Sequence, residues 1–233
     1  MEARIYIAIP VKDRKKIVSC CLPTIRDTRQ AQDFLVLSND GSTEFDNNWI
    51  WQFGDQIRSF NPGIGIQNQR RLHFCNYWEQ RHAYTHLYLT DSDIFHDPGW
   101  RKHALELQAQ HAGALVCLYN TRAHTNMIGN VFEDDPKSNV FWQSYAPGCS
   151  YLLTREHVEK IMHVIDDMAH WDWFVPSVLG NRCAVSRVSY CDHIGQGGER
   201  HDGSPGYDGG DRATNPTPWL VEKRKEIVRM LSA

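Results

Sequence analysis

Short apolar runs alternate with longer amphipathic stretches through the first half of the chain. Runs of this length and composition are typical of buried strands, and they occur at residues 5–10, 34–37, 57–60, 86–91 and 114–119. Helices are expected between them, over residues 14–21, 67–84 and 98–112. Asp13 and Asp97 are the expected caps of the first and third helices, and Pro23 should end the first. This order predicts an α/β fold with a mostly parallel central sheet flanked by helices on both faces.

The second half of the chain has a more mixed pattern. Strands are expected at residues 140–142, 150–153 and 185–190. Thr154 should cap a helix whose apolar side chains recur every three to four residues as far as Met168. A glycine-rich segment at 195–210 is expected to form a mobile loop or lid, and Thr217 precedes a terminal helix. We therefore expect a single domain over residues 1–233.

The sequence Asp91-Ser92-Asp93 directly follows the strand-like run 86–90. Side chains alternate along a strand, so the two carboxylates leave it on one face, about 7 Å apart along the chain. Two like charges this close favour a cation between them, and oxygen ligands suit Mg²⁺ or Mn²⁺. The alternative is a strand-end turn rich in aspartate. Asn39-Asp40 ends a neighbouring strand, so these groups are expected to share one cleft.

Composition narrows the classes of protein that remain. The 233 residues carry a formal net charge of −3, which argues against a strong nucleic-acid binder. No apolar run approaches the roughly 20 residues that a membrane span needs, so we expect no membrane association. The seven cysteines contain no CxxC pair, and no signal peptide is expected ahead of the first strand. We therefore expect a cytoplasmic protein with reduced thiols.

Four motifs in order resemble the GT-A glycosyltransferases, most closely the large inverting, family-two-like group. They are the strand ending in Pro10, then Asn39-Asp40-Gly41-Ser42, then residues 61–68, then Asp91-Ser92-Asp93. The resemblance covers roughly residues 5–195. Asn39 and Gln67 depart from the Asp and Arg that are usual in these motifs, and the last part of the chain matches loosely. The resemblance implies a Rossmann-like, GT-A-like domain, with a nucleotide-binding half at 1–95 and an acceptor half at 96–233.

The resemblance also implies a donor site in the first half. Pro10 and Val11 would line the base pocket, Asp40 would lie near the base or ribose, and Asn68 near the nucleotide. The donor would also meet Asp91 and Ser92. Turn formation is the alternative for Asp40. The metal, Mn²⁺ or Mg²⁺, would bind Asp93 directly, with Asp91 as a possible second ligand.

By the same resemblance, His193 in the late His-x-Gly segment would be a further metal ligand or phosphate contact. An ordinary polar histidine is the alternative, because the chain has twelve. The glycine-rich segment that follows carries Arg200 and His201, which would close over the diphosphate as part of a lid. The alternative is an unconstrained surface loop.

The acceptor half carries a candidate base. Asp172 stands between Trp171 and Trp173, where the resembling enzymes place the acid that takes the acceptor proton. The alternative is that Asp172 forms the N-cap of a helix that starts near Trp173. Asp166 and Asp167 are weaker candidates for the base, since both fall in the preceding predicted helix. Gly148, Trp171 and Trp173 are expected on the acceptor side.

These observations favour a metal-dependent transferase that moves a sugar from a nucleotide-sugar, most simply a UDP-sugar, to a hydroxyl with inversion. A nucleotidyltransferase is the second class, but the basic segment 10–16 lacks the glycines of its phosphate loop. A non-catalytic nucleotide- or sugar-binding module is the third class. Four classes of acceptor remain as alternatives: a carbohydrate, a protein, a small molecule and a hydroxymethylated base in viral DNA. A DNA acceptor would need a basic patch, with candidates Arg70, Arg71, His73 and His82.

Overall fold

The computed structural model describes residues 2–194 and 212–232. Its strands are β1 (Ile5–Val11), β2 (Phe34–Asn39), β3 (Gln56–Ser59), β4 (His86–Thr90), β5 (Ile94–His96), β6 (Leu115–Cys117), β7 (Val131–Glu133), β8 (Val140–Gln143), β9 (Ser150–Thr154), β10 (Cys183–Ser186) and β11 (Cys191–His193). Its helices are α1 (Lys15–Arg26), α2 (Asn47–Trp51), α3 (Ile66–Glu79), α4 (Trp100–Gln110), α5 (Arg122–Thr125), α6 (Arg155–Met162), a 3-10 turn η1 (Ile165–Asp167), α7 (Trp171–Val178) and α8 (Pro218–Ser232).

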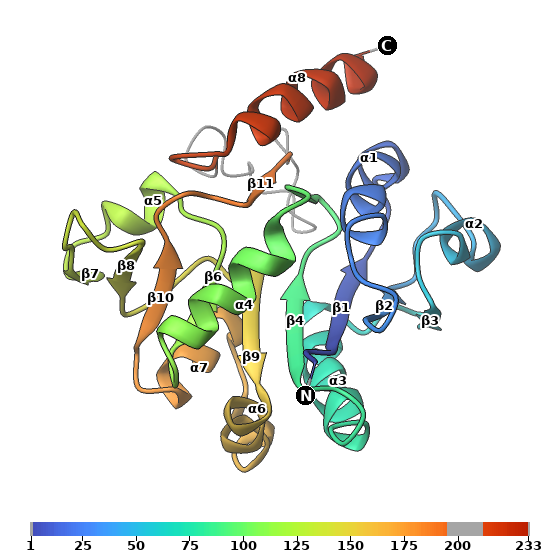
Figure 1. The fold of residues 1–233 in the computed structure, drawn as a ribbon. Coiled ribbons are helices and arrows are strands. Elements are labelled where there is room, and N and C mark those ends of the chain that lie inside the picture. The colour runs from blue at the N-terminus through green and yellow to red at the C-terminus, as the bar shows by residue number, and fades with distance from the viewer. Residues whose placement is uncertain (1, 195–211, 233) are drawn as a thin grey trace.

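In the described residues nine strands form one sheet in the order β3-β2-β1-β4-β9-β6-β10-β8-β7 (Figure 1). The four strands of the first half pair in parallel, as the β-α rhythm predicts. β9 pairs antiparallel with both β4 and β6, and β7 and β8 continue the sheet as antiparallel strands. The predicted α/β class, with a parallel first half and a mixed second half, is confirmed. β5 and β11 form a separate two-stranded ribbon.

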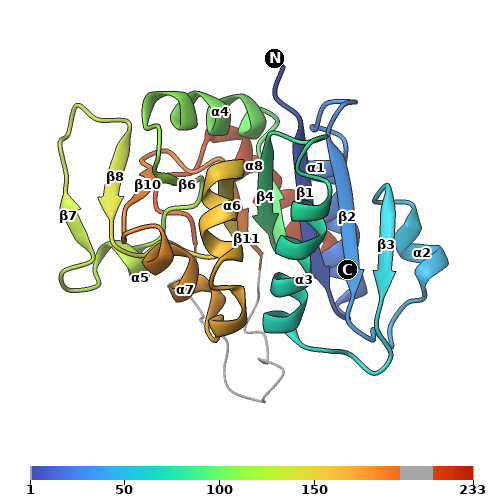
Figure 2. The same ribbon diagram turned by 90° about the horizontal axis from the view of Figure 1, so that it is seen from below.

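Helices cover both faces of the sheet. α1, α4 and α8 lie on one side, where Trp100 of α4 donates its indole N–H to Thr28, just beyond α1, at 3.0 Å. α3, α6 and α7 lie on the other (Figure 2). Strands such as β1 bury every side chain between these layers, which explains their continuous apolar sequence. None of the described helices is long and apolar enough to cross a membrane.

The boundaries of α1 and α4 differ from the sequence prediction. α1 continues through Pro23 to Arg26, because Leu22 and Ile25 on the last turns are buried in the core and packing outweighs the lost hydrogen bond. Its N-cap is Arg14 rather than Asp13. α4 begins at Trp100, and Asp97 instead accepts the backbone N–H of Gly99 at 2.7 Å.

The helix that Thr154 caps is shorter than predicted. Thr154 does form the cap, with a reciprocal capping box to His157. The helix ends at Met162, however, and a separate 3-10 turn carries Asp166 and Asp167. The apolar spacing beyond Met162 therefore reflects packing of that turn rather than continuation of the helix.

Candidate active site

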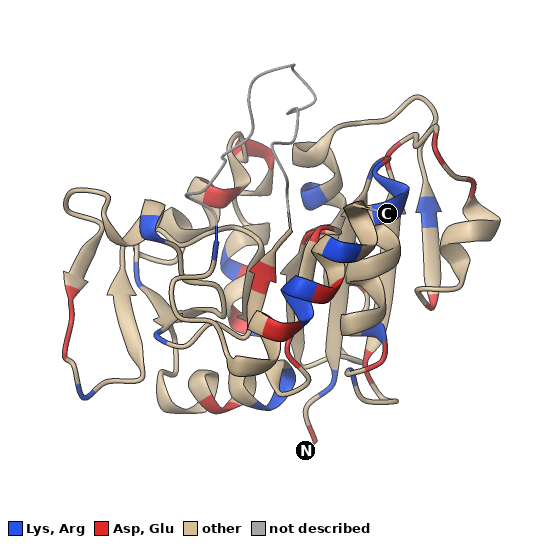
Figure 3. Ribbon diagram, turned by 90° about the horizontal axis from the view of Figure 1, so that it is seen from above, with Lys and Arg blue, Asp and Glu red and all other residues tan. Residues whose placement is uncertain are grey.

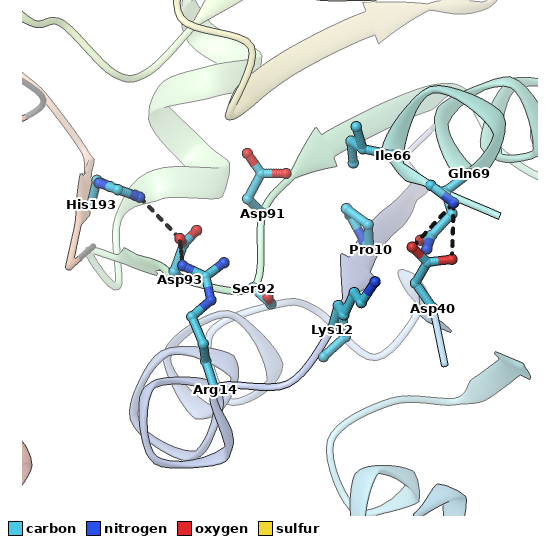
Figure 4. Close-up of a pocket in the computed structure, with 12 residues that line it drawn as sticks. Pro10, Lys12, Arg14, Asp40, Ile66, Gln69, Asp91, Ser92, Asp93 and His193 are labelled. Carbon is cyan, nitrogen blue, oxygen red and sulfur yellow. Dashed lines mark hydrogen bonds and ion pairs between the residues drawn. The ribbon is translucent and has the colours of Figure 1, made fainter. Parts of the chain in front are cut away.

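A cleft of about 490 Å³ opens at the carboxyl ends of β1 and β4. Parallel sheets bind ligands at this edge because the loops that follow the strands converge there. Of the predicted donor and metal residues, the cleft brings together Pro10, Val11, Asp40, Asp91, Ser92, Asp93 and His193 (Figure 4). It is also lined by Lys12, Arg14, Gly65, Ile66 and Gln69. The segment that contains Asp40 and the sequence Asp91-Ser92-Asp93, which are distant in the chain, thus meet at one edge of the sheet.

Asp40 forms a wall of the cleft and also holds the loop before α3. Its carboxylate accepts the backbone N–H groups of Ile64 at 2.6 Å and Gly65 at 3.2 Å. Gly63 permits this approach, since a Cβ atom there would lie 2.4 Å from the Asp40 carbonyl oxygen. The turn role and the position in the cleft therefore coexist at Asp40.

Asn68 does not line the cleft. It is exposed, and its side-chain amide donates to the carbonyl oxygen of Ile64 at 2.8 Å. The following residue, Gln69, is buried and lines the cleft instead. Adjacent residues on a helix point in different directions, which separates the two.

Asp91 is held by a fully buried arginine. Arg70 donates to the Asp91 carboxylate at 2.5 Å and to the Thr90 carbonyl oxygen at 2.9 Å. Its guanidinium also lies 4.4 Å from the ring centroid of Trp171. Burial raises the pKa of Asp91, and the Arg70 charge offsets part of that effect. One side chain thereby connects the end of β4 with the start of α7.

Arg14 and His193 both contact the same oxygen of Asp93. Arg14 donates from Nη1 to Oδ2 at 2.8 Å, and His193 Nε2 lies 3.0 Å from the same atom (Figure 4). Burial alone would raise the pKa of Asp93, but His193 and Arg14 together lower it below its usual range. The contact with His193 is set by the backbone, because β11 pairs antiparallel with β5, the strand that follows Asp93.

Arg14 reaches Asp93 from an unusual backbone conformation. Asp13 and Arg14 have backbone φ values of 48° and 55°, in a region that residues other than glycine adopt rarely. The loop is braced: the Asp13 carboxylate accepts the backbone N–H of Thr43 at 2.6 Å, and Glu44 accepts that of Lys15 at 2.7 Å. Sequence reasoning missed Lys12 and Arg14 as cleft residues, although the basic run that contains them was visible.

A second pocket of about 400 Å³ adjoins the first. The two share Asp91 and His193 in their walls. The second pocket contains the predicted acceptor-side residues Gly148, Trp171 and Trp173, together with Asp172. It is completed by Tyr119, Ala123, His124, Met127, Pro147 and Cys149, most of which lie in loops without a recognisable motif. The predicted base thus shares a pocket wall with Asp91, one of the aspartates of the predicted metal motif.

Gly148 allows the second pocket to form. A Cβ atom at this position would lie 2.7 Å from the Trp171 indole and 3.0 Å from the Cβ atom of Asp172. Trp171 is buried and stacked against Arg70, so it has little freedom to move. The N-cap of α7 is His170, and Asp172 lies within the first turn. The alternative role of Asp172 as that cap is therefore wrong.

Asp93 and His193 are the side chains best placed to hold a divalent metal. Within residues 2–194 and 212–232 no group of three or more His, Cys, Asp or Glu side chains converges as a metal site. A carboxylate and an imidazole suit a metal that takes its remaining ligands from phosphate oxygens and water, which is the usual arrangement for Mg²⁺ with nucleotides. The residues therefore fit a metal–diphosphate complex better than a metal bound by the protein alone.

The basic patch suggested for a DNA acceptor does not exist as predicted. Arg70 and His73 are fully buried, and burial lowers the pKa of His73 well below its usual range. Arg71 donates to the carbonyl oxygens of Asp166 and Met168. Acidic and basic positions are interspersed over the helices (Figure 3). Arg200 and His201, the predicted lid residues, lie outside the described residues.

No protein-family model matches the chain, and no curated protein sequence matches it. Similar solved structures include the mannosyltransferase PcManGT from Pyrobaculum calidifontis in complex with GDP-Man and Mn²⁺, at 13% identity and a TM-score of 0.57 over 79% of this chain. S. aureus TarS 1-349 in complex with UDP-GlcNAc is 13% identical, with a TM-score of 0.56 over 81% of this chain. GalNAc-T7 with UDP, GalNAc and Mn²⁺ is 8% identical, with a TM-score of 0.57 over 79% of this chain.

This chain covers 55% of the mannosyltransferase chain, 57% of the TarS chain and 42% of the GalNAc-T7 chain. At these identities the similarity concerns the fold, since a shared fold does not fix the reaction. The strand order, the cleft at the ends of β1 and β4, and these neighbours agree with the expected architecture. The chain therefore has the fold of the GT-A glycosyltransferases.

Proposed function

We propose that this protein is a glycosyltransferase that moves a sugar from a nucleotide-sugar donor to a hydroxyl acceptor. The observation that carries the proposal is the pair of adjoining pockets that share Asp91 and His193. One pocket is lined by strand ends and charged groups, which suits a nucleotide diphosphate. The other is lined by aromatic rings and Asp172, which suits an acceptor.

In the donor cleft, Pro10, Val11 and Asp40 would enclose the nucleoside, and Lys12 would face the phosphates. Asp93 and His193 would hold a divalent cation, Mn²⁺ or Mg²⁺. Such a cation, when bound, neutralises negative charge on the departing diphosphate. Arg70 keeps the Asp91 carboxylate in a fixed orientation by its hydrogen bond.

In the acceptor pocket, Asp172 would accept the proton of the attacking hydroxyl as its oxygen bonds to the sugar carbon. The diphosphate leaves from the opposite side of that carbon in a single displacement, which inverts its configuration. Trp171 and Trp173 would hold the acceptor against Asp172. A UDP-sugar is the first donor to test and a GDP-sugar the second, with saccharide and protein hydroxyls as the first acceptors.

The direct test is a thermal-shift panel of UDP-, GDP-, CMP- and TDP-sugars, each with and without MnCl₂. Wild type is compared with Asp93→Asn and with the control Asp167→Asn, an exposed acid in η1. A ligand at about 100 times its Kd stabilises the folded state by about 2.7 kcal/mol. For a chain of this size that corresponds to a rise in Tm of roughly 5–10 °C.

We expect one nucleotide class to raise Tm in the presence of Mn²⁺ for wild type and Asp167→Asn, with the effect lost in Asp93→Asn. Release of free nucleoside diphosphate in the presence of an acceptor then measures transfer. Stabilisation by a nucleoside triphosphate, with release of pyrophosphate, would instead support a nucleotidyltransferase. Binding of the sugar nucleotide with no turnover on any acceptor would support a binding module.

A further inference from the structure

The contact between Arg14 and Asp93 is not part of any motif that identifies the fold. The Arg14 side chain is 40% exposed, whereas the Asp93 side chain is 8% exposed. Arg14 and His193 both approach Oδ2 of Asp93, so the two lone pairs of that oxygen are already engaged. A cation bound to this carboxylate would also lie within a few ångströms of the guanidinium charge. The guanidinium charge in this position therefore disfavours the binding of a divalent cation at Asp93.

Arg14 can leave Asp93 without any change in the fold. Its backbone is fixed by the bonds of Asp13 to Thr43 and of Lys15 to Glu44. Its long side chain, in contrast, lies along the open wall of the donor cleft. Rotation about side-chain bonds is thus sufficient to move the guanidinium away from Asp93.

The same cleft offers the guanidinium a new partner once a donor is bound. Lys12 and Arg14 both line it and come from the loop between β1 and α1. A guanidinium forms paired hydrogen bonds with phosphate oxygens and exchanges a carboxylate for a phosphate readily. A nucleoside diphosphate in this cleft would therefore draw Arg14 toward itself.

We infer that Arg14 is a charge switch: it neutralises Asp93 when the cleft is empty and moves to the diphosphate when cation and donor bind together. This inference rests on the proposed function and adds a role for a residue outside its motifs. Because Arg14 and the cation compete for Asp93, the protein should bind Mn²⁺ weakly by itself. Because the diphosphate removes the competitor, nucleotide and Mn²⁺ should each strengthen the binding of the other.

The test measures Mn²⁺ binding by electron paramagnetic resonance and nucleotide binding by calorimetry, using Mn²⁺, UDP and GDP as probes. Wild type is compared with Arg14→Gln and with Lys16→Gln, which removes the same charge from an exposed position in the first turn of α1. Arg14→Gln should bind Mn²⁺ alone about tenfold more tightly than wild type, as expected for the loss of one charge-assisted contact. It should bind the nucleoside diphosphate with Mn²⁺ about tenfold more weakly. Lys16→Gln should match wild type in both measurements.

Arg14→Lys gives a second measure that does not depend on how well the glutamine variant folds. It keeps the charge but loses the paired hydrogen bonds, so both affinities should fall between those of wild type and Arg14→Gln. Equal or weaker binding of Mn²⁺ alone by Arg14→Gln would overturn the switch, and intact Mn²⁺-dependent nucleotide binding in wild type would then leave the proposed function standing. Failure of every protein to bind Mn²⁺, with or without UDP or GDP, would overturn both.

Discussion

The proposed donor cleft and the proposed acceptor pocket adjoin but are constructed differently. Charge pairs and backbone contacts hold the donor cleft, where Arg70 fixes Asp91 and where Arg14 and His193 meet Asp93. Aromatic packing forms the acceptor pocket, and several apolar side chains near it remain exposed, among them Trp173 at 46% and Met127 at 36%. A polar site positioned by strand ends suits one invariant ligand class. A pocket formed by loops and rings can be altered without disturbing the sheet.

Replacing the Asp172 carboxylate in the proposed acceptor pocket should give the largest effect on function. Asp172→Asn should lower kcat by about 100- to 10,000-fold, because the amide cannot take the acceptor proton. Nucleotide binding with Mn²⁺ should stay unchanged, since Asp172 lines the acceptor pocket only. Steady-state transfer and calorimetry measure the two quantities.

Asp166→Asn is the matched control for Asp172→Asn, because Asp166 is an exposed acid on η1 outside both pockets. It should keep wild-type kcat. If Asp172→Asn also kept wild-type kcat, the proton acceptor would lie elsewhere and the acceptor pocket would be misassigned.

Loss of the buried guanidinium should weaken both sites together. Arg70→Met leaves Asp91 without its partner and removes the stacking contact with Trp171, so we expect the free energy of unfolding to fall by about 3 kcal/mol. Urea denaturation measures this change. The neighbouring Arg71→Met, at a position that is only partly buried, should lose less than about 1 kcal/mol. If Arg70→Met and Arg71→Met lost equal free energy of unfolding, Arg70 would not link the two pockets.

The acceptor pocket can be disturbed by a single methyl group. In Gly148→Ala the new Cβ atom would meet the Trp171 indole at 2.7 Å, which requires a shift of Trp171 or of the turn. We expect a loss of about 2 kcal/mol in stability, within the usual range for overpacking. Transfer should fall while Mn²⁺-dependent nucleotide binding persists. A parallel loss of nucleotide binding would mean that the two sites are not separable.

Acid should lower the stability of the fold through His96, a buried histidine at the end of β5. Burial lowers the pKa of His96 to about 3, against about 6.5 in an unfolded chain. Between these values the unfolded state binds the additional proton, so the free energy of unfolding falls as pH falls below about 6.5. From pH 7.5 to 5.5 this histidine should account for a loss of about 1 kcal/mol.

The pH dependence is tested by urea denaturation at both pH values. His96→Gln should reduce the pH dependence by about this amount, whereas His82→Gln, at an exposed position, should leave it as in wild type. If the free energy of unfolding of His96→Gln fell as steeply between pH 7.5 and 5.5 as that of wild type, the acid sensitivity would lie in other groups.

The donor half could be predicted well from the sequence. Its strands bury residues such as Leu35, Val36 and Leu89 completely, and complete burial requires the continuous apolar runs that were visible. Asp40, Asp91 and Asp93 follow those strands directly, so the parallel order brings them to one edge. Local pattern and tertiary position agree in this region.

The remaining features depend on contacts between distant segments. No local signal places β9 between β4 and β6, because antiparallel insertion is decided by pairing across the sheet. Arg70 looks like a surface charge in the sequence, and its burial follows only from its contacts with Asp91 and Trp171. Arg14 reaches the cleft through a left-handed backbone that no residue preference indicates.

The ribbon of β5 and β11 bears on when the site can form during folding. His193 and Asp93 are 100 positions apart, and the pairing of β5 with β11 closes a loop that contains Gly148, Trp171 and Asp172. Contacts between such distant positions form late, because the entropy of loop closure must be overcome before they stabilise the chain. We therefore expect Asp93 to acquire its imidazole neighbour only after the intervening chain has folded, and an incompletely folded molecule to lack the finished site.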